Sequence, residues 1–220
     1  MKVVSLVPSM TETLLSWGIR PAACTRFCEQ PDLLHVGGTK DPDVEAIVEL
    51  DPELVIIDAE ENRIEDHDAL RAAGVPVHVL RIRSLHDVNE QLALLADLLG
   101  ARWSPVPEPR RPLRAAAFVP IWRRPWMALG APTYGTSLLT AIGVRNVCAD
   151  DGPYPSPALE TITGRRPDLV IAPSEPYPFS DRHRPELEAI APTVFVDGRD
   201  LFWWGSRTSA ALERLQAVLA

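Results

Sequence analysis

The chain has 220 residues, of which 46% are hydrophobic and 24% are charged, a balance that excludes an intrinsically disordered chain. Its formal net charge of -8 leaves no basic stripe for phosphate groups, so we expect no nucleic acid partner. No apolar run approaches the roughly 20 residues that a membrane helix needs, so we expect no membrane insertion of this chain.

The N-terminal part of the chain alternates predicted strands and helices. A strand over 2–7 leads into a helix in which Ser9 and Glu12 have the spacing of a capping box and Gly18 ends the helix. The elements that follow are strands over 22–25, 54–58 and 75–80 and helices over 43–50 and 64–73. This alternation predicts a doubly wound, parallel sheet.

A single long amphipathic helix is predicted over 84–100, and the proline-rich segment 104–112 after it is typical of an extended linker. The alternation then restarts, with strands over 114–121, 127–130, 168–172 and 193–196 and helices over 134–142, 157–163, 184–190 and 206–219. We therefore predict two doubly wound α/β lobes with parallel sheets, residues 1–82 and 102–220, bridged by a single long helix over 83–101.

The two lobes share an internal repeat. Residues 42–60 align without a gap with residues 157–175, a constant shift of 115 residues. The matching pairs are Pro42/Pro157, Glu45/Glu160, Ile47/Ile162, Pro52/Pro167, Leu54/Leu169, Val55/Val170, Ile56/Ile171 and Glu60/Glu175.

The repeat places one acid just after equivalent strands, at Glu60 or the adjacent Glu61 and at Glu175. Two exposed acids that lie far apart cannot share a proton, so they are a poor acid/base dyad. They are better suited to bind arginines on a partner with two-fold symmetry, although solvated loop glutamates are a plausible alternative.

Candidate ligand-binding residues follow predicted strands, because ligands of open parallel sheets bind beyond the carboxyl ends of the strands. The second half of the chain adds aromatic residues in loops that also carry arginines, a composition that suits a large, flat, partly polar ligand. The candidates are Pro8, Ser9, Arg26, Phe27, Trp122, Trp126, Tyr134, Tyr177, Phe179, Trp203 and Trp204.

Signatures of an enzyme or a metal site are weak. The sequence lacks the nucleophile-elbow, phosphate-loop, dinucleotide and zinc-protease motifs, and its five histidines have no metal-ligand spacing. We expect no catalytic residue, no metal site and no cofactor. The enzymatic alternative depends on Cys28 as a nucleophile or redox group with His35 nearby.

Several segments together resemble the class III substrate-binding proteins of ABC importers for vitamin B12 and iron chelates, over residues 2–218. They are VVSLVPSMTETLLSWG, TRFC, VGGTKDPDVEAIVELDPELVI, EEN, IWRRPWM, RRPDLVIAPSEPYPF and DGRDLFWWGSR. The resemblance implies that a corrinoid, or alternatively an iron siderophore or haem, binds in the cleft between the lobes.

The resemblance also implies a partner and roles for individual residues. A permease dimer would be bound through Glu175 and through Glu60 or Glu61, and Trp122, Trp126, Tyr177 and Trp204 would cover the face of the ligand. Such proteins act outside the cytoplasm, in the periplasm or at the cell surface, whereas a start at Met1 without a leader would make the protein cytoplasmic. A cytosolic protein that handles corrinoids or metal chelates without an importer is therefore an alternative.

Overall fold

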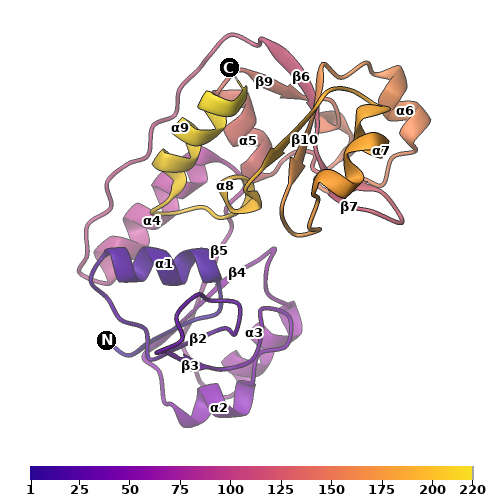
Figure 1. Cartoon of the computed structure of the whole chain (residues 1–220). Coiled ribbons are helices and arrows are strands. Elements are labelled where there is room, and N and C mark those ends of the chain that lie inside the picture. Colours follow the sequence, from indigo (N-terminus) through magenta and orange to yellow (C-terminus); the bar gives the residue numbers. More distant parts are fainter. Residues whose placement is uncertain (220) are drawn as a thin grey trace. The chain divides into compact units, whose positions relative to one another are not determined.

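The computed structural model describes residues 1–219, which separate into two compact units (Figure 1). The first unit comprises Met1–Ile82 and Asn89–Pro105, and the second comprises Arg83–Val88 and the residues from Val106 onward. The long helix α4 (Leu85–Leu98) begins in the second unit and ends in the first. Each unit contains its own parallel sheet, so the predicted α/β class is confirmed.

The first unit has a five-stranded sheet of order β3-β2-β1-β4-β5, in which all neighbouring strands are parallel. Its strands are β1 (Val3–Ser5), β2 (Ala23–Cys24), β3 (Leu34–His35), β4 (Leu54–Asp58) and β5 (Val77–Leu80). Its other helices are α1 (Pro8–Ser16), α2 (Val44–Glu49) and α3 (Ile64–Ala72). Strand β1 is central, with Val4 paired with Ala23 on one side and Val55 on the other.

The start of α1 differs from the prediction, whereas its end agrees with it. The helix begins at Pro8, whose fixed φ suits a first helical position, so the expected capping box of Ser9 and Glu12 does not form. At the other end, the amides of Gly18 and Ile19 donate to the carbonyls of Leu15 and Leu14, both at 2.9 Å. Gly18 has φ +75°, the left-handed conformation that this Schellman motif requires.

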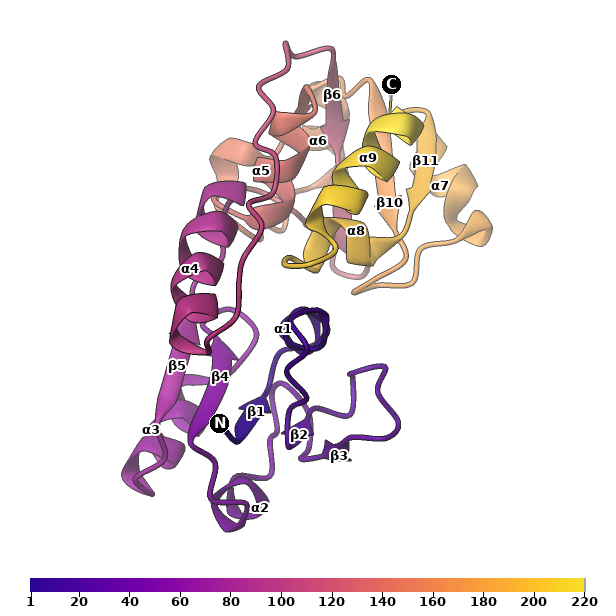
Figure 2. The same cartoon turned by 90° about the vertical axis from the view of Figure 1, so that its left-hand side faces the viewer.

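The second unit has a four-stranded parallel sheet of order β11-β10-β6-β9 and a separate antiparallel hairpin. Figure 2 shows β6, β10 and β11 of this sheet. The sheet contains β6 (Ala115–Phe118), β9 (Val144–Asn146), β10 (Leu169–Pro173) and β11 (Thr193–Val196), and the hairpin contains β7 (Pro120–Trp122) and β8 (Met127–Ala128). The helices are α5 (Tyr134–Ala141), α6 (Leu159–Gly164), α7 (Arg184–Glu188), α8 (Gly198–Phe202) and α9 (Thr208–Leu219), with 3-10 turns η1 (Ala149–Asp151) and η2 (Asp181–His183).

Several parts of the second unit differ from the sequence prediction, including the unpredicted strand β9. The single strand expected over 114–121 is divided into β6 and β7, because Pro120 has no amide hydrogen to continue a parallel ladder. The segment after β11 contains the unpredicted helix α8, whose first turn is capped by Asp197 through the amide of Arg199 at 3.0 Å.

The repeat is present in the structure with the shift read from the sequence. Helices α2 and α6 begin at 44 and 159, and strands β4 and β10 begin at 54 and 169, so both pairs are related by 115 residues. The strand order β2-β1-β4-β5 in the first sheet corresponds to β9-β6-β10-β11 in the second. The repeat thus specifies the same helix-then-strand packing twice.

The repeated apolar residues form the cores of the two units. Ile47 of α2 packs with Val55 in the first unit, and their counterparts Ile162 and Val170 pack together in the second. All four side chains are fully buried. Within residues 1–219 we find no helix with the length and hydropathy needed to span a membrane.

Candidate functional site

Four of the predicted aromatic residues come together in the second unit. We call Trp122, Trp126, Tyr177, Phe179 and His183 the aromatic cluster. Trp122 meets Tyr177 edge-on at 5.6 Å between ring centroids, Tyr177 lies 4.7 Å from Phe179, and Phe179 stacks on Trp126 at 6.1 Å. Phe179 is 4% exposed and Trp122 is 44% exposed, so the cluster runs from the core to the surface.

Two elements supply these rings. The hairpin β7-β8 carries Trp122 and Trp126, and the loop after β10 carries Tyr177 and Phe179. Pro176 precedes Tyr177 in this loop, and prolines reduce the conformational entropy that a loop loses when it is ordered. The rings are therefore held on a hairpin and a restricted loop, which suits a preformed binding surface.

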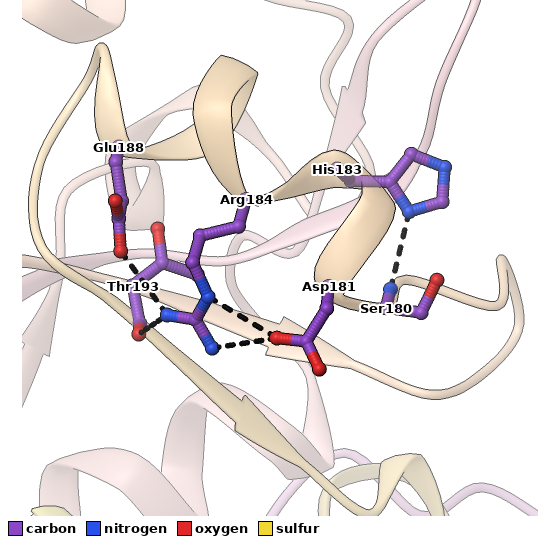
Figure 3. A network of polar contacts seen from close by, with 6 residues as sticks. All are labelled: Ser180, Asp181, His183, Arg184, Glu188 and Thr193. Atoms are coloured by element: carbon purple, nitrogen blue, oxygen red, sulfur yellow. Dashed lines mark hydrogen bonds and ion pairs between the residues drawn. The ribbon is translucent and has the colours of Figure 1, made fainter.

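His183, the last residue of η2, anchors the base of this loop. The amide of Ser180 donates to its Nδ1 at 3.1 Å (Figure 3). Its ring lies 5.4 Å from that of Tyr177, with Nε2 3.4 Å from the Tyr177 hydroxyl. Burial, followed by the positive charges of Arg182 and Arg123, lowers the pKa of His183, so the ring is uncharged at neutral pH.

A network around Arg184 holds the same turn against the sheet (Figure 3). The Arg184 guanidinium donates to Asp181 Oδ1 at 2.9 Å and 3.1 Å, to Glu188 Oε1 at 3.1 Å and to the carbonyl of Thr193 on β11 at 3.3 Å. Arg123, in the turn of the hairpin, pairs with Glu186 of α7 at 2.7 Å. These ion pairs connect the hairpin, η2 and α7 around the aromatic cluster.

Two other predicted aromatic residues are in the core. Tyr134 is 4% exposed, and its hydroxyl lies 3.0 Å from the Thr208 hydroxyl. Trp204 is also 4% exposed. Neither presents its ring to solvent in this structure.

Trp203 lies beside Glu175, the predicted docking acid. The guanidinium groups of Arg199 and Arg207 lie 5.3 Å and 5.2 Å from its ring centroid. Burial, the largest effect, raises the pKa of Glu175, while a hydrogen bond from Trp203 and the charges of both arginines act in the opposite direction. Glu175 is thus a half-buried acid with cations nearby rather than a freely solvated one.

In the first unit, the predicted ligand residues are in the first turn of α1 and in the loop after β2. Ser9 is 5% exposed, and Pro8 is half-buried. Arg26 forms a bidentate pair with Asp41 at 2.9 Å and 3.0 Å and lies over the Phe27 ring at 4.9 Å. Phe27 is 54% exposed, so this loop offers an aromatic surface next to a charged pair.

The loop that carries Glu60 and Glu61 is held by a residue that the sequence prediction missed. Asp58, the last residue of β4, accepts the amides of Glu60 and Glu61 on Oδ1 at 2.8 Å and 3.2 Å. The Asn62 side chain accepts the Asp58 amide at 2.9 Å and donates to the Thr39 carbonyl at 2.9 Å. An Asp and an Asn four residues apart just after a strand are the sequence signal that indicates such a loop.

The buried Asp58 carboxylate has an unusual environment. It is 2% exposed, and its second oxygen, Oδ2, is buried without a hydrogen-bond partner. Burial raises the pKa of Asp58 to about 6, with the nearby charges of Glu61 and Glu60 contributing and the two amides opposing. The loop that carries the predicted docking acids is therefore anchored by a buried acid whose pKa is raised above its ordinary value.

The described residues do not bring Cys28 and His35 together, as the enzymatic alternative supposed. The Cys28 thiol lies among the hydroxyls of Thr11 and Thr25, whereas His35 contacts the Gln30 carbonyl at 3.1 Å, and no hydrogen bond joins the cysteine to the histidine. Between residues 1 and 219 there is also no group of three or more His, Cys, Asp and Glu side chains that could hold a metal ion.

Comparison with known proteins gives a consistent result, although no protein-family model matches the chain. The vitamin B12-binding protein of Yersinia pestis (strain Pestoides F) is 24% identical over 197 residues, covering 77% of this chain and 68% of that protein. The relative of the same name from Yersinia pseudotuberculosis serotype O:3 (strain YPIII) has the same identity and coverage.

Solved structures give the same fold. The periplasmic vitamin B12 binding protein of Vibrio cholerae superposes with a TM-score of 0.79 at 17% identity, covering 99% of this chain and 96% of that one. A periplasmic heme binding protein from Pseudomonas aeruginosa gives 0.78 at 19% identity, covering 98% and 91%. These proteins are named as binding proteins and not as enzymes, as the resemblance led us to expect. The chain therefore has the fold of the class III periplasmic substrate-binding proteins, and its sequence is similar to those of vitamin B12-binding proteins.

Proposed function

We propose that the protein is the substrate-binding component of an ABC importer and that it captures a corrinoid. The similarity to curated vitamin B12-binding proteins over 77% of the chain is the observation that carries this proposal. The aromatic cluster supports it, because a corrin ring offers a broad apolar face that aromatic rings cover well.

The exposed parts of the site define how each unit would contact such a ligand. In the second unit, Trp122 and Tyr177 are the accessible members of the aromatic cluster, and in the first unit Phe27 is the exposed ring. Arg26 and Arg123 flank these rings and suit the polar groups at the edge of a corrinoid. Tyr134 and Trp204 support the fold from the core instead.

Haem is the second candidate ligand, because a protein of the same fold is named as a periplasmic heme binding protein. The specific observation that favours it is the pair formed by the Tyr177 hydroxyl and His183 Nε2, 3.4 Å apart. Phenolate and imidazole are both ligands of haem iron. An iron siderophore presents a similar size and remains a third possibility that the same experiment tests.

We place the permease contacts at Glu175 and at Glu60 or Glu61. The support is the repeat, which puts Glu60 and Glu175 at the same position after equivalent strands. A contact holds each loop in place. The Glu60 amide donates to Asp58, and Gly198 approaches the backbone of Glu175 closely. Because solved structures of the same fold are named as periplasmic proteins, we assign this protein outside the cytoplasm; a cytosolic corrinoid-handling protein is the alternative.

Titration of the purified protein with cyanocobalamin, haemin and a ferric hydroxamate siderophore tests the ligand. Quenching of the six tryptophans reports binding, and calorimetry gives the stoichiometry. We expect one cyanocobalamin per chain with a Kd of about 1 μM or tighter, which corresponds to about -8 kcal/mol. Tight binding of haemin or of the siderophore alone would replace the corrinoid in the proposal, and no binding by any of the three would overturn it.

A further inference from the structure

Two buried cysteines enclose the loop that carries Arg26 and Phe27. Cys24 ends β2 and is fully buried, and Cys28 is 6% exposed. The Cys28 amide donates to the Thr25 carbonyl at 3.0 Å, so the chain turns back on itself between the two cysteines. Their side chains pack together with Leu33 in one small buried cluster.

Hydroxyl groups provide further partners for the Cys28 sulfur. The Thr11 and Thr25 hydroxyl oxygens lie 3.3 Å and 3.4 Å from it. The Thr11 hydroxyl also lies 2.9 Å from Ser5 Oγ, and the Ser5 hydroxyl donates to the Val7 carbonyl at 3.1 Å. The Thr11 hydroxyl accepts a hydrogen bond from the Cys28 thiol. If its hydrogen rotates, the same hydroxyl can donate to the Cys28 sulfur, while the Ser5 hydroxyl still donates to the Val7 carbonyl.

This environment distinguishes the two sulfurs chemically. As a thiolate, Cys28 can accept hydrogen bonds from Cys24, Thr11 and Thr25, and these bonds, that of Cys24 first, lower the pKa of Cys28 against the effect of burial. The same hydrogen bond and burial raise the pKa of Cys24. Cys28 is thus the more acidic thiol of the pair.

We propose that Cys24 and Cys28 form a dithiol site that hydrogen peroxide oxidises to an internal disulfide. The Cys28 thiolate attacks one peroxide oxygen, the O–O bond breaks, and hydroxide leaves, which yields a sulfenic acid on Cys28. The Cys24 sulfur then attacks the Cys28 sulfur, the S–O bond breaks, and the departing hydroxide takes the Cys24 proton as water. The two thiols lose two electrons, which reduce one peroxide.

The position of the site gives this oxidation a consequence for the loop. The disulfide would close a ring that contains Thr25, Arg26 and Phe27, so it would restrict the loop that presents the exposed Phe27 side chain. This consequence, unlike the disulfide itself, rests on the proposed function, because it assumes that Phe27 contacts the ligand. We expect the oxidised protein to bind cyanocobalamin with an altered affinity.

Digestion with trypsin detects the disulfide directly, because Arg26 lies between the two cysteines. We expect that hydrogen peroxide removes two hydrogen atoms from the intact mass of the reduced protein and that peptides 3–26 and 27–40 are then recovered joined. Reduction before digestion should separate them. If peroxide leaves the two peptides separate, the proposal is wrong.

Three variants assign the roles of the thiols. In Cys24→Ser, Cys28 should accumulate as a sulfenic acid that dimedone traps, whereas Cys28→Ser should leave Cys24 largely unreactive. Cys148→Ser is the matched control, since Cys148 is a buried free cysteine of the second unit, and it should form the disulfide as the wild type does. Equal peroxide reactivity of Cys24→Ser and Cys28→Ser, both with the melting temperature of the wild type, would contradict the assignment.

The ligand experiment separates the two proposals. Calorimetry with cyanocobalamin on the reduced and the oxidised protein should give different affinities. Identical binding by both forms would refute the proposed effect on the loop but not the proposed disulfide. Absence of binding by both forms would refute the corrinoid assignment without affecting the peptide mapping.

Discussion

Asp58 shows how one residue links the core of a lobe to its exposed loop. It ends a fully buried strand, and its Oδ1 organises the amides of Glu60 and Glu61. Its Oδ2 is buried without a partner, so the ionised form is disfavoured in the folded protein. The buried Asp58 carboxylate therefore destabilises the folded protein when it is ionised. The same carboxylate positions the loop that carries the proposed docking acids.

Asp58→Asn should change how stability depends on pH. The pKa of Asp58 rises from 3.8 to about 6 on folding, so between these values the folded protein binds more protons than the unfolded chain. The contribution of Asp58 to the free energy of unfolding is therefore fully present below 3.8 and is lost as the pH rises through about 6. Relative to the wild type, Asp58→Asn should gain up to about 3 kcal/mol across this window.

Urea unfolding of both proteins at several pH values measures this difference. Because every other titrating group is common to the two proteins, the difference between their unfolding free energies isolates Asp58. A difference that stays constant from acid to neutral pH would show that Asp58 does not titrate in this range.

Substitution of Trp122 tests the ligand proposal most directly. Trp122→Ala should weaken cyanocobalamin binding roughly tenfold, because one aromatic contact contributes on the order of 1 kcal/mol. Its effect on stability should be small, since the ring is 44% exposed. Calorimetry and thermal unfolding measure the two effects.

Trp103→Ala is the matched control for Trp122→Ala. Trp103 meets Trp17 edge-on at 6.2 Å and 77°, the same interplanar angle as that between Trp122 and Tyr177, but in the first unit and outside the predicted site. This variant should leave the affinity unchanged. Equal losses in both variants would mean that the loss does not report a ligand contact.

At the scale of elements, the loop after β10 depends on the start of α8. A Cβ atom added to Gly198 would lie 2.7 Å from both the amide nitrogen and the carbonyl oxygen of Glu175. Only glycine allows this backbone approach, so the unpredicted helix α8 determines the position of Glu175, the proposed docking acid. This close approach is a tertiary contact between two residues that are 23 positions apart in the chain.

Gly198→Ala should destabilise the protein by about 1–3 kcal/mol, although alanine is the better helix former, because the added methyl group must displace backbone atoms. Gly164→Ala is the control: Gly164 ends α6, and no heavy atom lies within 4 Å of its added Cβ. Thermal and urea unfolding compare the two. If Gly198→Ala is as stable as Gly164→Ala, Gly198 does not fix the Glu175 loop.

At the scale of the whole molecule, the repeat explains why two lobes of one chain carry an acid at the same position. Strand β4 lies between β1 and β5, and its equivalent β10 lies between the equivalent strands β6 and β11. Glu60 and Glu175 each follow their strand by two residues. A partner with two-fold symmetry can use such a pair, since each half of the partner meets the same local structure. The proposed docking to a permease therefore needs the acids of both lobes.

Glu60→Gln or Glu61→Gln, and separately Glu175→Gln, should lower the affinity for the cognate permease on the order of tenfold each, because a charge-assisted hydrogen bond to an arginine is lost. Ligand affinity should not change. Permease-stimulated ATPase activity and binding to the reconstituted permease measure this effect.

Glu45→Gln and Glu160→Gln control for the loss of one negative charge per lobe. These two exposed acids are also related by the repeat, but they lie in the first turns of α2 and α6. They should leave permease binding unchanged. A similar loss in all of these variants would assign the effect to net charge and not to docking.

Much of this structure could be predicted from local patterns. Apolar periodicity gave the alternation of strands and helices, and the 115-residue shift identified α2 with α6 and β4 with β10, because each segment's own side chains decide which face is buried. The glycines at positions 18, 74 and 100 indicated helix ends for a similarly local reason, since each adopts a positive φ. The resemblance to the binding-protein family rested on the same segments.

Contacts between distant segments decided the rest. The sequence could not show that Trp122, Trp126, Tyr177 and Phe179 share one cluster while Tyr134 and Trp204 are buried, because all six look alike as aromatic residues near turns. It could not show that Asp58 supports the Glu60 loop or that Gly198 fits against Glu175. The sequence by itself determined the class of fold and the repeated unit, since these depend on local periodicity. Only the tertiary structure decided which side chains reach the surface, because burial depends on the neighbours that folding brings from elsewhere in the chain.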